Sequence, residues 1–269
     1  MLAQERHAVI MEMLKEQNII KISDIAKRFG VSNLTARRDL DVLQDQNLVR
    51  RVYGGAVLCQ EGAPEELAAA VKKEVDPHGT LRRARRAAIA DAAVKMVRDG
   101  DRVHLGNGIT VEEVARRLRR FQRLSIVTGS LGAVNQLMNS GHEVYVLGGL
   151  LQHDERNLTG SYAIDMAKDF HVNIAFMPCA GVSAEYGVMS DYLPATVLGR
   201  VGIENAQKAV LLCGSKKIGR TAFHTVCPVS ALDAIITDDG ITQEQKESLE
   251  ACGVQVIVVS PKLEDAAEI

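Results

Sequence analysis

The chain of 269 residues has no tryptophan, only five phenylalanines and five tyrosines, and no long hydrophobic run. Scarce aromatic side chains disfavour binding to single-stranded nucleic acids, because that binding depends on stacking bases against aromatic rings. The most apolar segments, such as residues 254–259, are far shorter than the roughly 20 residues that cross a bilayer. No signal sequence opens the chain, so we expect a cytoplasmic protein with no membrane partner.

The cysteines are odd in number, widely spaced and without a Cys-x-x-Cys pair, which argues against a disulfide framework and a structural zinc site. The histidines also lack the spacing of metal ligands. We therefore expect reduced thiols, no metal ion and no cofactor. The five histidines from His104 onward are interpreted as surface or core residues: His104, His142, His153, His171 and His224.

Charge is unevenly distributed although the net charge is only −2. Residues 1–57 carry nine Lys and Arg against seven Asp and Glu, which is +2 and leaves −4 for the rest. A positive N-terminal part has the right sign for DNA binding, but the excess is small. The stronger evidence has to come from the pattern of residues. A chain of this length and ordinary composition can bury two hydrophobic cores.

Residues 1–57 have the pattern of a winged helix-turn-helix domain. Helical periodicity predicts a first helix up to about Asn18, and residues 19–22 predict a short strand. Ser23 is expected to cap a second helix ending at Gly30, and Ser32 to cap a third. One face of the third helix is apolar and the other would enter the major groove. The buried face holds Ala36, Leu40 and Leu43, and the exposed face holds Leu34, Thr35, Arg37, Arg38 and Asp41.

A two-stranded wing is predicted by residues 48–57, which alternate apolar and polar around a Gly-Gly turn. Taken alone, Arg37 and Arg38 are more typical of a solvated helix face paired with nearby carboxylates. Residues 22–32, 35–40 and 51–56, in this order, closely resemble the DNA-binding region of DeoR-family repressors. Tyr53 and Ala36 depart from the family's usual His and Ile. The resemblance implies contact with a double-stranded DNA operator through Ser32, Asn33, Thr35, Arg37, Arg38, Arg50, Arg51 and Tyr53.

Residues 58–80 contain Pro64 and a turn-like segment at 76–79, and we interpret them as a partly helical linker. A helix is then predicted from Leu81 to about Arg98, with four arginines in its first turns. Arginines do not complement a helix N-terminus, so anion binding is about as well supported as a solvated basic face. The family resemblance places Arg86 near an effector pocket.

Residues 81–269 are predicted to form an α/β effector-binding and oligomerisation domain. Short apolar strands alternate there with amphipathic helices, which predicts a mostly parallel sheet covered on both faces. The expected strands are 102–105, 124–128, 143–147, 173–177, 209–213, 234–237 and 254–259. Five helices are expected between these strands. Two end near residues 120 and 139, and the other three cover residues 162–169, 197–205 and 243–251.

Four loops rich in small residues follow these strands, at 106–110, 128–130, 148–149 and 214–217. Their backbone N–H groups and hydroxyls could approach a phosphate, although a single loop of this kind is more often a plain turn. None has the Gly-x-Gly-x-x-Gly spacing of a dinucleotide site, which disfavours NAD. The predicted effector contacts are Arg86, Asn107, Gly108, Thr110, Thr128, Ser130, Gly148, Gly149, Ser215 and Lys217.

The resemblance to the DeoR family extends through residues 217–220 and 236–238. It implies a Rossmann-like effector domain, similar in fold to ribose-5-phosphate isomerase, that binds phosphorylated sugars or related metabolites. The chain has Gly106, Ile109, Gly129 and Gly214 where the family has Asp, Thr, Asn and Asp. The two missing carboxylates would be acceptors for sugar hydroxyls.

These observations predict a DNA-binding repressor of a carbohydrate-utilisation operon, released by a small-molecule effector such as a phosphorylated sugar. A homo-oligomer, dimer or tetramer, is expected because one recognition helix rarely gives sufficient affinity. No catalytic residue is assigned. One alternative is a sugar-phosphate isomerase-like enzyme with an attached DNA-binding module, for which Asp191 and Asp238 are the acids near the pocket. Another is an oligomeric scaffold whose N-terminal domain contacts proteins.

Overall fold

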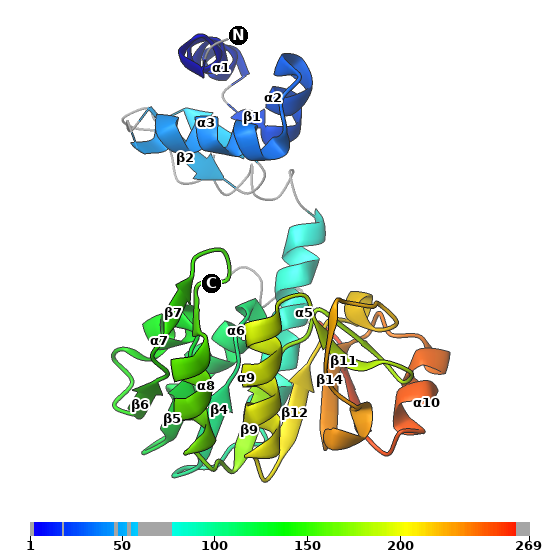
Figure 1. Ribbon diagram of the computed structural model, residues 1–269. Helices are drawn as coiled ribbons and strands as arrows, with labels where there is room; N and C mark the ends of the chain where they lie inside the picture. The colour runs from blue at the N-terminus through cyan, green and yellow to red at the C-terminus, as the bar shows by residue number, and fades with distance from the viewer. Residues whose placement is uncertain (1–2, 18, 46–47, 53–54, 59–76, 262–269) are drawn as a thin grey trace. The chain divides into compact units, whose positions relative to one another are not determined.

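A computed structural model describes residues 3–17, 19–45, 48–52, 55–58 and 77–261. The chain divides into two compact units, Met1–Gly79 and Thr80–Ile269 (Figure 1). Residues 59–76 of the predicted linker, and Tyr53, lie outside the described residues. Among the helices that the structure describes, none is long and apolar enough to cross a membrane.

The N-terminal unit is a winged helix-turn-helix, as predicted. Strands β1, β3 and β2 form an antiparallel sheet in that order beside three helices. Ala36, Leu40 and Leu43 of the third helix are buried as expected, and they pack in one core with Ile10 and Ile25. The elements are α1 (Ala3–Gln17), β1 (Ile19–Lys21), α2 (Ile22–Phe29), α3 (Asn33–Asp45), β2 (Val49–Val52) and β3 (Gly55–Leu58).

Two of the three predicted helix caps in this unit are confirmed. Gly30 ends α2 with a φ of +63°, and the Ser32 hydroxyl accepts the Thr35 N–H over 3.1 Å at the start of α3. The cap predicted at Ser23 is wrong. Helix α2 already begins at Ile22, because the buried Ile22 side chain belongs to the apolar face of the helix, and no side chain caps it.

Gly55 is a strand residue and not part of the predicted Gly-Gly turn. It opens β3, where it pairs with Val52 on one side and Lys21 on the other. A Cβ at this position would collide with the backbone carbonyl of Ile20. Glycine is therefore required here because β1 approaches β3 too closely for any side chain.

The C-terminal unit is built on a parallel sheet of seven strands in the order β15-β14-β12-β9-β4-β5-β6. Every neighbouring pair is parallel, as the alternation of strands and helices predicted. The strands are β4 (Arg102–Leu105), β5 (Ser125–Thr128), β6 (Glu143–Val146), β9 (Ile174–Met177), β12 (Ala209–Leu212), β14 (Ala234–Asp238) and β15 (Gln255–Val259).

Helices cover both faces of this sheet and create two buried clusters (Figure 1). Along β9, Ile174 and Phe176 point to one cluster while Ala175 and Met177 point to the other, as the alternation of strand side chains requires. The first cluster receives α5 (Pro77–Val94), α6 (Ile109–Leu118) and α7 (Leu131–Leu137). The second receives α8 (Ser161–Lys168), α9 (Leu193–Glu204) and α10 (Gln243–Glu250).

Several short elements were missed by the sequence analysis. Each strand among them has three or four residues, which is too short for a recognisable period-two pattern. They form the antiparallel hairpin of β7 and β8 and the antiparallel sheet β10-β11-β13. The missed elements are β7 (Leu150–Gln152), β8 (Asn157–Thr159), β10 (Gly181–Ser183), β11 (Gly187–Ser190), β13 (His224–Cys227), and the 3-10 turns η1 (Ser215–Lys217) and η2 (Val229–Ala231).

Candidate functional site

The topology creates a site at the carboxyl edge of the parallel sheet. From β4 the chain adds β5 and β6 on one side, and from β9 it adds β12, β14 and β15 on the other. Strands β4 and β9 are neighbours, so the loops that follow them diverge at a topological switch point, where ligands bind in open α/β sheets. A cavity of about 270 Å³ lies there, between residues 106–108 and residues 178–180.

The four predicted loops follow β4, β5, β6 and β12, which are all parallel, so they share this edge as expected. Of the ten predicted effector residues, Asn107, Gly108 and Lys217 line the cavity. The other seven lie outside the wall of this cavity, and their contacts with an effector stay predictions. They are Arg86, Thr110, Thr128, Ser130, Gly148, Gly149 and Ser215.

Three of those seven residues hold the loops in place through buried hydrogen bonds. The Thr128 hydroxyl donates to the Leu105 carbonyl over 2.8 Å, and Ser130 caps α7. Ser215 donates from its hydroxyl and its backbone N–H to the carboxylate of Asp238, over 2.7 and 2.9 Å. Asp238 also pairs with Arg85 of α5, 3.2 Å away, so it joins β14, the η1 loop and α5.

Lys217 provides the positive charge of the cavity. Its ammonium group donates to the backbone carbonyl of Cys179 over 2.5 Å. A carbonyl oxygen carries no net charge, so this bond orients the ammonium without neutralising it. Among the described residues of the wall, Lys217 alone is positively charged at pH 7, while Glu155 and Asp191 are acidic.

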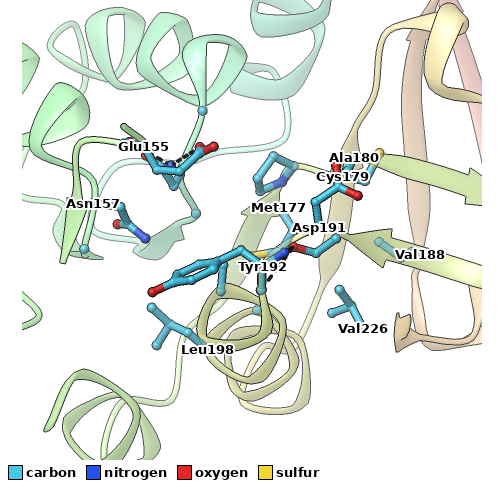
Figure 2. Close-up of a pocket in the computed structure, with 18 of the residues that line it drawn as sticks. Glu155, Asn157, Met177, Cys179, Ala180, Val188, Asp191, Tyr192, Leu198 and Val226 are labelled. Carbon is cyan, nitrogen blue, oxygen red and sulfur yellow. Dashed lines mark hydrogen bonds between the residues drawn. The ribbon is translucent and has the colours of Figure 1, made fainter. Parts of the chain in front are cut away.

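The β7–β8 hairpin forms one side of the cavity and contributes polar groups that the sequence analysis did not identify. The Asn107 amide donates to the Glu155 carbonyl over 3.0 Å and contacts its carboxylate at 3.3 Å. The Tyr192 hydroxyl donates to the Gln152 amide oxygen over 3.1 Å. Figure 2 shows Glu155 and Asn157 on one side of the cavity and Cys179 on the other. The polar run 152–157 was the available signal for this hairpin.

His104 on β4 lies in the cavity wall and is only 4% exposed. Its ring packs against helix α9 at Gly202. A Cβ atom on Gly202 would lie 3.0 Å from the imidazole Cε1 atom. Burial lowers the pKa of His104 from 6.5 to about 4. The imidazole is therefore neutral at pH 7, and the core interpretation is right for this histidine.

The outer face of α3 carries Arg37 and Arg38, both exposed, with Thr35 half-buried beside them. The Thr35 hydroxyl lies 2.9 Å from the Ser32 hydroxyl, so both residues also stabilise the helix start. Four other predicted DNA contacts have side chains that lie outside the part of the chain that the structure describes: Asn33, Arg50, Arg51 and Tyr53.

Asp39, on the opposite face of α3, was not identified from the sequence. Arg6 of α1 donates to its carboxylate from two nitrogens, over 2.8 and 2.9 Å, and the His7 ring contacts it at 3.0 Å. Burial would raise the pKa of Asp39, but the hydrogen bonds from Arg6 and His7, together with their charges, outweigh it and lower that pKa. This cluster holds α1 against α3 and so orients the exposed arginines.

Comparison with known proteins decides the family. The DeoR-like helix-turn-helix domain matches residues 6–62, and the DeoR C terminal sensor domain matches residues 82–239. The chain belongs to the DeoR family of transcription regulators. Its two domains are therefore a DNA-binding domain and a sensor domain, as the sequence predicted.

Two curated relatives cover nearly the whole DeoR-family chain. The HTH-type transcriptional repressor GlcR of Bacillus subtilis (strain 168) is 30% identical over 259 residues, which is 96% of this chain and 97% of the relative. The Glycerol-3-phosphate regulon repressor of Escherichia coli (strain K12) is 26% identical over 87% of this chain and 90% of its own length. Both relatives are named as repressors.

A solved structure of ribose 5-phosphate isomerase A from Methanocaldococcus jannaschii resembles part of the fold. It is 19% identical, with a TM-score of 0.37 over 49% of this chain and 52% of that chain.

Two of the three glycines at which this DeoR-family chain departs from the usual residues, Gly106 and Gly129, lie in crowded surroundings. A Cβ on Gly129 would lie 2.6 Å from the Leu158 carbonyl oxygen and 3.0 Å from the Asn157 amide oxygen. A Cβ on Gly106 would lie 2.7 Å from the Pro178 Cδ atom. Neighbouring residues thus occupy the space that side chains would need at these two positions. The carboxylates of the cavity come instead from Glu155 and Asp191.

Proposed function

We propose that this DeoR-family regulator represses a carbohydrate-utilisation operon and leaves its operator when a phosphorylated sugar or polyol occupies the cavity. The observation that carries the proposal is Lys217, whose ammonium bonds to a carbonyl in the cavity wall and forms no ion pair with a carboxylate among the described residues. Charge-assisted bonds from an ammonium are the interactions that hold a phosphate oxygen.

The loop after β4 supports the same ligand chemistry. Gly108 precedes α6 with a φ of +138°, and no side chain caps the helix there. The N–H groups at a helix start attract anions, and this one opens at the cavity wall. Glu155 and Asp191 can accept hydrogen bonds from sugar hydroxyls. The cavity therefore suits a ligand that combines an anionic group with several hydroxyls.

Lys217→Met tests the proposal. We expect the variant to bind operator DNA normally and to bind the phosphate ester about 10- to 150-fold more weakly, because a charge-assisted bond contributes roughly 1.5–3 kcal/mol. Calorimetry with a panel of sugar and polyol phosphates measures the affinity, and release of operator DNA by the same compounds measures the response.

Lys216→Met is the matched control, since Lys216 is exposed in the same turn but outside the cavity wall. It should behave as wild type. The proposal is wrong if no phosphate ester binds the wild-type protein, or if Lys217→Met binds such an ester as tightly as Lys216→Met does.

The isomerase alternative makes a different forecast for the same samples. Proton abstraction needs a base within reach of the substrate, and Asp191 and Glu155 are the carboxylates in the wall. Asp238 lies outside the wall and is bonded to Ser215 and Arg85. We propose binding without turnover, so proton exchange with solvent at the bound ester should be absent in NMR spectra.

We also propose that the protein is a homo-oligomer that assembles through the β6 edge of the sheet. Strand β6 pairs with β5 alone among the described strands, and two of its apolar side chains, Tyr145 on one face and Val146 on the other, are exposed. Leu150, which opens β7 four residues after β6 ends, is 65% exposed. Apolar side chains along an unpaired edge favour contact with a second copy of the chain.

Light scattering at micromolar concentration should therefore give at least twice the 29.2 kDa of one chain. The double variant Val146→Lys and Leu150→Lys should shift the mass toward the monomer, because it places charge on the edge. Phe223→Lys is the control, since it is an exposed apolar residue away from β6. A 29.2 kDa wild-type protein with full operator affinity would contradict the proposal.

A further inference from the structure

Two buried cysteines meet beside the cavity, each just beyond the end of a strand of the sheet: Cys179 follows β9 and lines the cavity wall, and Cys213 follows β12. Met177 of β9 pairs with Leu211 of β12, so Cys179 and Cys213 occupy corresponding positions two residues further along. Their sulfur atoms lie 3.3 Å apart. Their exposures are 7% for Cys179 and 0% for Cys213. Two thiols at this separation have been brought together by the fold and not by a flexible loop.

The spacing of the two strands that precede the pair is compatible with a covalent bond between the sulfurs. Neighbouring strands lie about 4.8 Å apart, and disulfides form where Cα atoms are separated by about 4.4–6.8 Å. The sulfur atoms must approach from 3.3 Å to about 2.05 Å. Because the two residues follow adjacent paired strands, a small shift of their side chains and loops provides this movement.

The surroundings assign different roles to the two thiols. Cys179 lines the cavity and is accessible to a small solute that enters it, whereas Cys213 lies behind it. The hydrogen bond between the two thiols, and then the ammonium of Lys217, lower the pKa of Cys179 against the effect of burial. The hydrogen bond with Cys179 and burial raise the pKa of Cys213. Cys179 is therefore the thiol that more readily becomes a nucleophilic thiolate.

We propose that Cys179 and Cys213 form a redox-sensitive dithiol that a hydroperoxide oxidises to a disulfide in the cavity wall. The Cys179 thiolate attacks a peroxide oxygen, the O–O bond breaks, and the leaving hydroxide takes a proton to become water. The resulting sulfenic acid is attacked by the Cys213 sulfur, which loses its proton as a second water departs. Two thiols are oxidised by two electrons, and one hydrogen peroxide is reduced to two waters.

The other described cysteines provide internal controls. Burial raises the pKa of Cys227 to about 11, so this thiol stays protonated and reacts slowly. The half-buried Cys252 lies at the end of α10, where its thiol contacts the Ser248 carbonyl at 3.6 Å. The proposal depends on the pairing of Cys179 with Cys213 and does not require the effector chemistry of the proposed function.

The experiment exposes the reduced full-length protein to submillimolar hydrogen peroxide, blocks the remaining thiols with N-ethylmaleimide and maps peptides by mass spectrometry without reduction. We expect a linked pair of peptides that contain Cys179 and Cys213. Its mass should be lower by two hydrogen atoms than the sum of the two reduced peptides, and dithiothreitol should separate it into those peptides. Both thiols should be lost before Cys227 reacts. Cys213→Ala should leave Cys179 as a sulfenic acid that dimedone traps, and Cys227→Ala should form the link at the wild-type rate.

Circular dichroism shows whether each variant folds. If a variant does not fold, the peptide map of the wild-type protein still shows whether Cys179 and Cys213 become linked. The proposal would be overturned if Cys179 and Cys213 were both still fully alkylated by N-ethylmaleimide at a peroxide dose that had already oxidised Cys252. It would also be overturned if Cys179 were linked preferentially to a cysteine other than Cys213.

Discussion

Arg38→Ala is expected to weaken operator binding by about 1–3 kcal/mol, which is about 5- to 150-fold. Arg38 is exposed on α3, the third helix of a helix-turn-helix domain, which is the helix that enters the major groove in this class of domain. An arginine there contacts a base edge or a phosphate. Because the side chain lies outside the core that Ala36, Leu40 and Leu43 form, the variant should fold as wild type.

Gel shifts with DNA from the promoter regions flanking the gene, repeated over a salt titration, measure the loss. If Arg38 contacts a phosphate, its removal should also make binding less dependent on salt, by about one released ion. If it contacts a base, its removal should relax the sequence preference. Arg119→Ala on the sensor domain removes the same charge from an exposed position and serves as the control. Unchanged operator affinity in Arg38→Ala would show that this face of α3 does not read DNA.

The second large effect is a loss of stability in acid that originates from His104. In the unfolded chain this histidine takes up a proton near its ordinary pKa of 6.5, but in the folded protein burial lowers that pKa to about 4. Between these values the unfolded state binds more protons, so the free energy of unfolding falls as the pH is lowered. The shift corresponds to about 3 kcal/mol, lost from pH 6.5 downward and fully lost near pH 4.

Denaturant unfolding of the wild type and of His104→Gln across this pH range isolates the contribution. Glutamine has a similar size and does not titrate, so the variant should lose much less stability between pH 7 and pH 4. Carboxylates such as Asp39, whose folded pKa is lowered, also destabilise the protein in acid, but they do so equally in both proteins. Parallel pH profiles for the two proteins would contradict the burial of a neutral imidazole at this position.

The functional class followed from local patterns that need no knowledge of distant contacts. Helical periodicity, the turn at Gly30 and the cap at Ser32 are interactions between residues a few positions apart, so the sequence alone predicts the helix-turn-helix. The same holds for the seven strands of the parallel sheet, whose apolar runs are separated by amphipathic helices. The order of these motifs also carried the family resemblance, which the comparisons confirmed.

The composition of the cavity wall was only partly predictable. Loops that follow parallel strands share one edge, and for that reason the sequence predicts Asn107, Gly108 and Lys217. Glu155 was missed because it lies in a short hairpin, 48 residues from Asn107 in sequence, that folds back onto Asn107. Thr128 resembles a ligand residue in the sequence, yet its hydroxyl is buried and bonded to a neighbouring strand.

By itself, the sequence determined that the protein is a two-domain DeoR-family regulator, which strands build its parallel sheet and which loops gather at one edge of that sheet. Only the tertiary structure decided that Asp39 binds Arg6, that His104 is buried beneath α9 and that Cys179 lies against Cys213. Each of these contacts joins residues more than 30 positions apart, and each depends on which strand or helix lies next to another. Sequence periodicity specifies the faces of an element, but the order of strands and the packing of helices specify its neighbours.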